Sequence, residues 1–254
     1  MRSLARIKGY HDTVRRQAAE LAAWNRELET RVAAQVEEIE RMGRLRRFLS
    51  PQLADVVVND EGLLASHRRE IVVVFCDFRG FTSFAEASEP EEVMHVLGEY
   101  HLALGARIEE HGGTLERFTG DGAMVFFNDP VPVPDPAGAA IAMSLAVRDD
   151  VRRLAAGWAR RGHDLALGIG VAQGFATLGR IGYPGRSDYA AIGSVTNLAA
   201  RLCSDAGPWQ VLVTDRVLAQ VEEQVAADVV GDVQPKGFSR PVRVHDVVAG
   251  TVRR

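Results

Sequence analysis

Apolar and small side chains recur between residues 12 and 49 in steps that alternate between four and three, which is the spacing of a heptad repeat. The stripe is narrow, and Asn25 and Gln35 fill two of its positions, where a polar residue fixes register and strand number. We therefore predict a parallel two-stranded coiled coil over residues 1–49. The alternative is a single amphipathic helix packed on its own domain. The stripe contains Val14, Ala18, Leu21, Leu28, Val32, Ile39 and Met42.

The next segment, residues 50–69, predicts a short helix followed by a linker. Pro51 can start a helix, and apolar positions continue from Leu53 to Val58. A turn is expected at Glu61-Gly62. The pattern therefore divides the chain into a coiled-coil domain at 1–49, a transducer helix and linker at 50–69, and a globular domain at 70–250.

The globular domain opens on an unbroken apolar run from Ile71 to Phe75, followed by Cys76 and Asp77. A short Val-rich run without alternation predicts a strand that is buried on both faces. Asp77 then stands at the strand end, and Phe78–Thr82 is expected to form a tight turn into a helix that starts at Ser83.

The remaining pattern predicts an α+β sheet that helices cover on one face. A helix ends at Gly112-Gly113, and two short strands flank the turn Gly120-Asp121-Gly122. The helices are expected at about 89–111, 137–161 and 195–204, with a further one after 214. The strands are expected at 114–119, 123–127, 165–171, 211–214, 229–235 and 242–248, with a strand or turn at 188–193 and a glycine-rich excursion at 174–187.

Composition is that of an ordinary globular protein, with 46% hydrophobic residues and a net charge of −4. Residues 1–50 hold 11 Arg and Lys against 7 Asp and Glu, and the rest holds 19 against 27. The basic part is helical in pattern, so we interpret it as a charged helix surface and not as a nucleic-acid arm.

Cys76 and Cys203 provide neither a disulfide framework nor metal-ligand spacing, which fits a reducing compartment. Met1–His11 lacks the apolar core of a signal peptide, and no run is long enough to span a membrane.

Two carboxylates stand out as candidate metal ligands. Asp77 follows the buried strand, and Asp121 lies at the hairpin tip. Taken singly, each has an ordinary explanation, since Asp77 could cap a helix and Gly-Asp-Gly is a favourable turn. If the hairpin lies beside the strand, the two acids converge next to a turn whose N–H groups can hold a phosphate, as a two-metal phosphoryl or nucleotidyl transfer site requires.

Three segments in this order strongly resemble the class III nucleotidyl cyclase catalytic domain. They are FCDFRGFT at Phe75–Thr82, FTGDG at Phe118–Gly122, and IGSVTNLAARL at Ile192–Leu202. The resemblance covers about residues 45–250, and residues 45–58 are similar to the helix-loop element that precedes the domain in many bacterial members. It implies a ferredoxin-like βαββαβ domain with extra C-terminal strands and helices.

The resemblance also implies roles for individual residues. Asp77 and Asp121 match the metal-binding aspartates, and Phe78 matches the residue whose backbone carbonyl adds a ligand to Mg²⁺ or Mn²⁺, two ions per site. Asn197 and Arg201, four apart and so on one helix face, match the pair that orients the ribose and stabilises the α-phosphate charge. The loop that matches the triphosphate-binding loop contains Phe78, Gly80, Phe81 and Thr82.

Two parts of the pattern depart from the family. In the family, two positions usually read the base. They hold Lys with Asp or Thr for adenine, and Glu with Cys for guanine. Here these positions hold Arg117 and Ala190. Arg117 can still donate to adenine N1, whereas Ala190 has no polar side chain; Asp188 and Ser194 are open alternatives. The usual triphosphate-binding Lys aligns with Phe238, so that Lys236 or Arg240 is the candidate substitute.

The implied activity is that of an adenylate cyclase, which converts ATP to 3′,5′-cyclic AMP and pyrophosphate. A homodimer paired head to tail, with the coiled coil as a second contact, would share Asp77 and Asp121 from one chain with Arg117, Asn197 and Arg201 from the other. A guanylate cyclase and a catalytically silent nucleotide-binding or dimerisation module are the alternatives. Because the heptads start so early, we expect an upstream sensor or membrane part outside this chain. The cyclase would then work in the cytoplasm, free or tethered to a membrane through that part.

Overall fold

The computed structural model describes Trp24, Glu27, Leu28, Arg31, Val32 and Gln35, and then residues 65–183, 186–234, 238 and 240–250, with side chains at 186 and 187 left aside. The chain forms two compact units, Met1–Leu49 and Ser50–Arg254. In the first unit the six described residues are helical, and Arg31 donates to Glu27 at 2.7 Å one turn away. Pairing into a coiled coil, and the predicted transducer at 50–64, lie outside the described residues.

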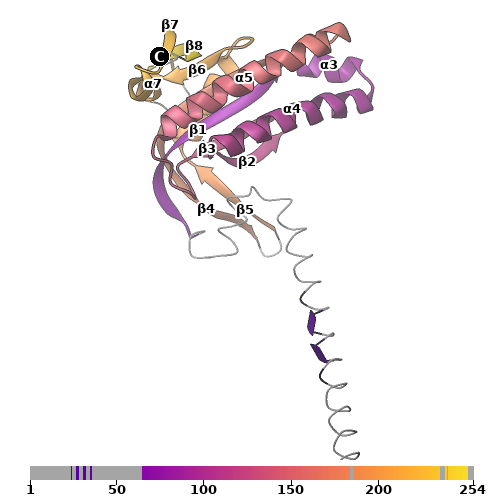
Figure 1. Ribbon diagram of the computed structural model, residues 1–254. Coiled ribbons are helices and arrows are strands. Elements are labelled where there is room, and N and C mark those ends of the chain that lie inside the picture. The colour runs from indigo at the N-terminus through magenta and orange to yellow at the C-terminus, as the bar shows by residue number, and fades with distance from the viewer. Residues whose placement is uncertain are drawn as a thin grey trace, which may run out of the picture. The chain divides into compact units, whose positions relative to one another are not determined.

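The second unit is built on an eight-stranded sheet with β1 (His67–Arg79) near its centre (Figure 1). The strand order is β2-β3-β1-β4-β6-β8-β7, and β5 pairs with β4 outside this path. The other strands are β2 (Thr114–Thr119), β3 (Gly122–Phe127), β4 (Ala166–Tyr183), β5 (Arg186–Ile192), β6 (Val211–Thr214), β7 (Val225–Val233) and β8 (Val242–Gly250). The helices are α3 (Phe81–Ala87), α4 (Pro90–Glu110), α5 (Pro136–Arg160), α6 (Ser194–Asp205) and α7 (Asp215–Val221).

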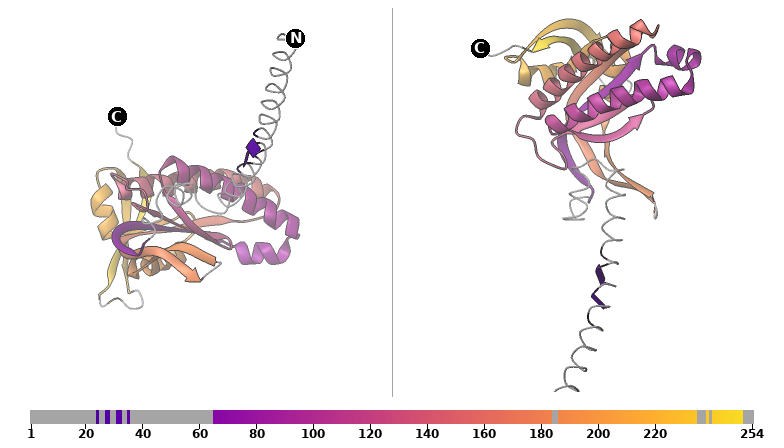
Figure 2. Two further views of the ribbon diagram at one scale, coloured as in Figure 1. Left: turned by 90° about the horizontal axis from the view of Figure 1, so that it is seen from below. Right: turned by 45° about the vertical axis from the view of Figure 1, so that its right-hand side comes forward.

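Helices cover both faces of the sheet, so the expectation of a single covered face was wrong. Val72 and Val74 of β1 pack in one core with α4, α5 and α7, and Figure 2 shows α4 and α5 side by side over the strands. Ile71 and Val73 point the other way, into a second core with α6. The second core forms because α6 has its own apolar stripe, made of Val195, Leu198, Ala199 and Leu202.

β1 is longer than its apolar run predicts. It pairs with β4 along its whole length, from His67 opposite Leu178 to Arg79 opposite Ala166. Phe78 therefore belongs to the strand and not to a turn, and α3 starts at Phe81 rather than at Ser83. The change of direction falls on Gly80, whose φ is 85°, and a Cβ there would lie 2.8 Å from the Asp164 carbonyl oxygen.

The described residues of the glycine-rich excursion expected at 174–187, which are 174–183 and 186–187, are also strand. β4 runs without a break to Tyr183 and returns as β5, beyond the point where β1 begins. Its glycines allow close approaches instead of ending the strand; a Cβ on Gly174 would lie 3.3 Å from the Val195 side chain. This hairpin carries Ala190, so the fold places one expected base-reading position on a paired strand.

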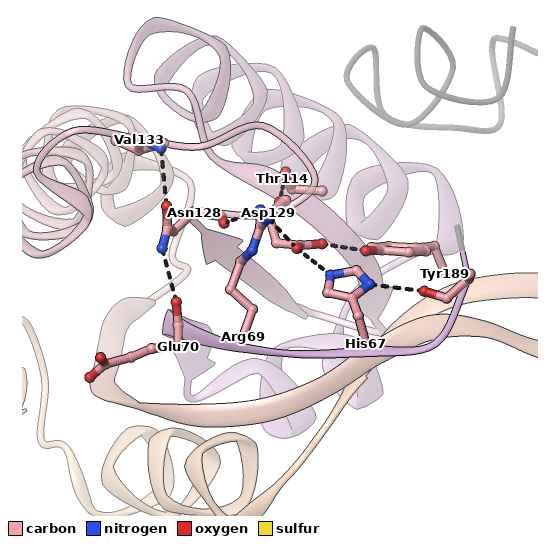
Figure 3. Close-up of polar contacts among 9 residues, drawn as sticks. His67, Arg69, Glu70, Thr114, Asn128, Asp129, Val133 and Tyr189 are labelled. Atoms are coloured by element: carbon pink, nitrogen blue, oxygen red, sulfur yellow. Dashed lines mark hydrogen bonds and ion pairs between the residues drawn. The ribbon is translucent and has the colours of Figure 1, made fainter. Parts of the chain in front are cut away.

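A buried carboxylate, Asp129, holds the entry of β1 against β5 (Figure 3). Its oxygens lie 2.8 Å from His67 Nε2 and 3.2 Å from Arg69 Nη1, and accept a hydrogen bond from the Tyr189 hydroxyl. Thr114 donates to the Asp129 carbonyl at 2.8 Å. The start of β1 and the strand β5, which carries Ala190, are therefore joined through Asp129.

His67 makes this junction sensitive to pH. The Ala65 carbonyl and then Asp129 raise its pKa above 6.5, with Arg69 opposing. A pKa raised by folding contributes stability that is complete below the unfolded pKa and is lost as pH rises through the folded pKa.

We expect His67→Gln to reduce the free energy of unfolding more at pH 5.5 than at pH 8.5, by up to about 1 kcal/mol, since the ring is partly exposed. Urea unfolding at both pH values measures this, with exposed His95→Gln as the control; an equal cost for His67→Gln at both would contradict it.

Among the described residues, no helix is both long and apolar enough to cross a membrane.

Candidate active site

The hairpin of β2 and β3 brings Asp121 to Asp77. β3 pairs with β1 up to Ala123 opposite Cys76, so the turn that carries Asp121 lies beside Asp77. The approach is close, since a Cβ on Gly122 would lie 2.8 Å from Asp77 Oδ1. Burial raises the pKa of both carboxyls, and the charge of Asp121 raises that of Asp77 further. The two acids expected from the sequence to converge do so in one chain.

The ring of Phe78 is buried in the core, and its backbone carbonyl lies on the side of Asp77. The ring is buried against Tyr100, Trp158 and Phe81, with centroid separations of 4.6, 5.7 and 5.9 Å. Its carbonyl accepts from Arg79 Nη1 at 3.0 Å on the same side as Asp77. Packing of the ring therefore fixes the direction of a carbonyl beside the two carboxylates.

Arg79 is a site residue that the sequence analysis did not single out. Its Nη1 lies 3.0 Å from Asp77 Oδ2, and its Nε donates to the Ala206 carbonyl at 2.8 Å. Its Nη2 donates to the Cys203 carbonyl. The guanidinium thus joins the metal-ligand candidate on β1 to the C-terminal end of α6, where carbonyls favour a cation. Gly168 makes room for it, since a Cβ there would lie 2.3 Å from Nη2.

A cavity of about 230 Å³ opens beside Asp77, whereas Asp121 and Phe78 are not part of its lining. The oxygens of Asp77, Asp121 and the Phe78 carbonyl are of the ligand type that Mg²⁺ and Mn²⁺ prefer. Within the described ranges, no cluster of three His, Cys, Asp or Glu side chains could hold a metal alone, so phosphate and water would complete the coordination. The lining is Phe75, Cys76, Asp77, Arg79, Thr119, Ala200, Cys203 and Ser204.

The two cysteines of this region are structural. Both are buried, and burial raises their pKa, that of Cys203 to about 11. Cys203 Sγ donates to the Gly168 carbonyl at 3.3 Å. Protonated, buried thiols are neither nucleophiles nor good metal ligands.

Asn197 and Arg201 lie on the exposed face of α6, one turn apart. Arg201 Nε donates to Asp205 at 2.8 Å, and neither residue lines the cavity at Asp77, to which α6 contributes Ala200, Cys203 and Ser204. Within one chain, Asn197 and Arg201 therefore stay outside the cavity that Asp77 lines.

The positions expected from the sequence to read the base lie on β2 and β5. Arg117 is exposed, and its Nη2 lies 3.3 Å from Glu116 Oε1. Ala190 is half-buried opposite Gly179 of β4, while Asp188 and Ser194 are exposed. Glu116 is a buried acid that the motif comparison did not single out.

The remaining predicted substrate-binding residues lie around Gly80 and before β8. Gly80 and Thr82 are exposed, and Phe81 is half-buried beside Phe78 and Phe84. Arg240 is exposed, whereas Lys236 lies outside the described residues.

Comparison with known proteins agrees with this geometry. The family described as the adenylate and guanylate cyclase catalytic domain matches residues 64–248. The chain is 30% identical over 210 residues to an adenylate cyclase of Anabaena cylindrica, covering 80% of this chain and 41% of that protein. It is 31% identical to adenylate cyclase 1 of Rhizobium meliloti, over 74% of this chain and 29% of that one. The chain thus spans less than half the length of these relatives.

Two solved structures are also similar. The adenylyl cyclase CyaB from P. aeruginosa is 33% identical with a TM-score of 0.71, covering 75% of this chain and 98% of that one. The guanylyl cyclase Cya2 is 34% identical with a TM-score of 0.68, covering 73% and 95%. The mixed α+β fold predicted from the sequence is confirmed by these likenesses. The chain belongs to the class III adenylate and guanylate cyclase catalytic domain family.

Proposed function

We propose that this cyclase is an adenylate cyclase, in which the 3′-hydroxyl of ATP attacks its own α-phosphorus to give 3′,5′-cyclic AMP and pyrophosphate. The observation that carries the proposal is the convergence of Asp77 and Asp121 beside the Phe78 carbonyl. Two divalent cations held there would acidify the hydroxyl and neutralise the triphosphate. Asp77 and Asp121 would hold these cations, and we assign no side chain as general base.

The second half of the site is proposed to come from another copy of the chain. Asn197 and Arg201 are exposed on α6 and do not line the cavity beside Asp77 of their own chain. In a head-to-tail homodimer, Arg201 of one chain would stabilise the charge that develops on the α-phosphate held by Asp77 and Asp121 of its partner. Each dimer would then hold two shared sites.

The base should be adenine. Arg117 only donates hydrogen bonds, so it fits the adenine N1 acceptor and opposes the guanine N1 donor. We expect kcat/KM for ATP to exceed that for GTP by about 5-fold to 150-fold, the value of one specific hydrogen bond. Parallel assays of both nucleotides with Mg²⁺ and with Mn²⁺ measure it, and a higher kcat/KM for GTP would reverse the assignment.

A guanylate cyclase is the second candidate, because the likeness to Cya2 is as strong as that to CyaB. The third candidate is a catalytically silent module, because Ala190 has no polar side chain at a position expected to read the base. Against the silent module, the metal-ligand candidates Asp77 and Asp121 and the polar pair on α6 are all present. Absence of any cyclic product with Mn²⁺ would support it.

A further inference from the structure

Glu116 is a carboxylate buried in the strand that carries Arg117. Its side chain is 3% exposed, whereas that of Arg117 is 62% exposed. The pairing of β2 with β3 shifts between Leu115 and Arg117, so Glu116 is the extra residue of a β-bulge. A bulge re-aims a side chain that regular alternation would send to the other face. The fold thus places an acid inward, beside the exposed cation.

The two oxygens of Glu116 have different surroundings. Oε1 accepts from Arg117, and the backbone N–H of Ala191 on β5 also stabilises the charged carboxylate. Oε2 is buried and has no hydrogen-bond partner in the part of the chain that the structure describes. Burial raises the pKa of Glu116, while Arg117 and then the Ala191 N–H act in the opposite direction. A buried carboxylate oxygen without a donor is unfavourable, so a ligand that brings an N–H group would be bound selectively.

The edge of adenine matches this arrangement. Its N1 accepts a hydrogen bond, and the 6-amino group next to it donates. Arg117 can only donate, Glu116 when ionised can only accept, and Ala190 on the neighbouring strand offers no polar side chain. Guanine presents the opposite groups at these two positions, an N1 donor to Arg117 and an O6 acceptor to Glu116.

We propose that Glu116 is a specificity-determining residue, whose Oε2 accepts an N–H of the ATP 6-amino group while Arg117 donates to N1. The proposal rests on the proposed adenylate cyclase function. The hydrogen-bond acceptor that Ala190 cannot provide would then come from Glu116 on β2, in place of Asp188 or Ser194. Because Oε2 is shielded from solvent, this contact requires the Glu116 side chain to turn toward the base while Oε1 still accepts from Arg117.

The test measures binding of two nucleotides that cannot cyclise, 3′-deoxy-ATP and the 3′-deoxy triphosphate of purine riboside, which lacks the 6-amino group. With Mn²⁺ present, we expect the wild-type chain to bind 3′-deoxy-ATP roughly 10-fold to 100-fold more tightly than its analogue. In Glu116→Ala the ratio should fall to about one, because 3′-deoxy-ATP loses the contact to its 6-amino group, whereas any loss caused by release of Arg117 is shared by both nucleotides. Glu116→Gln keeps the shape and one acceptor oxygen, and should keep a reduced ratio.

Asp188→Ala is the matched variant, since it removes a neighbouring acid and leaves Glu116. It should keep the wild-type ratio. The proposal is overturned if Glu116→Ala and Glu116→Gln weaken both nucleotides equally, as a purely structural acid would, or if Asp188→Ala abolishes the ratio. Cyclic AMP formation by the wild-type chain is measured separately. A chain that makes none but shows the predicted binding ratios would refute the proposed activity and leave the assignment of Glu116 standing.

Discussion

Asp77→Ala and Asp121→Ala should each lower kcat/KM for cyclic AMP formation by at least about 100-fold, because either change removes an oxygen ligand from the cation site. Initial rates with ATP and Mn²⁺ measure the loss. The fold should survive, since burial, and for Asp77 also the charge of Asp121, already makes the charged carboxylates unfavourable in the folded chain. Thermal unfolding checks this.

The matched control for these two variants is Asp228→Ala, an exposed acid on β7 that lies in no part of the site. It should retain wild-type turnover. Turnover close to wild type in Asp77→Ala or Asp121→Ala, with the fold intact, would remove the basis for the two-metal proposal.

The second large effect is recovery of activity from two inactive chains. Asp77→Ala and Arg201→Ala should each be inactive as homodimers, because every shared site lacks either its metal ligand or its charge-stabilising guanidinium. After mixing, a heterodimer contains one site with intact Asp77 from one chain and intact Arg201 from the other. Its second site carries both defects.

The recovered activity should reach roughly a quarter of wild type, if half of the dimers are mixed and half of their sites work. The measurement is cyclic AMP formation before and after mixing, together with detection of heterodimers through two different tags. A site built within one chain gives no recovery, because each chain carries its own defect. No recovery with heterodimers present would therefore refute the shared site and leave the metal proposal standing alone.

The sequence predicts the frame of the site well because its signals are local. An unbroken apolar run identifies β1, and Gly-Asp-Gly identifies the hairpin that carries Asp121. The spacing of Asn197 and Arg201 places both on one face of α6, and the structure shows both exposed there. Each of these features depends on a few neighbouring residues, so a single sequence reveals it.

Features that depend on tertiary packing could not be predicted in this way. The glycines of β4 look like loop residues, but pairing with β1 up to Leu178 and with β5 from Thr177 onward keeps the strand extended. The contact of Arg79 with the end of α6 depends on the space at Gly168, far away in the sequence. Glu116 looks like an exposed edge residue until the bulge and β5 are seen together; an acid next to the expected base-reading cation was the one available signal.

The most direct test of the central claim is identification of the products that the wild-type chain forms from ATP and from GTP, with Mg²⁺ and with Mn²⁺. Chromatography with mass detection separates the cyclic nucleotides and quantifies pyrophosphate. The proposal predicts 3′,5′-cyclic AMP and pyrophosphate in equal amounts, with less cyclic GMP from GTP under the same conditions. No cyclic nucleotide with either metal, or more cyclic GMP than cyclic AMP, would contradict it.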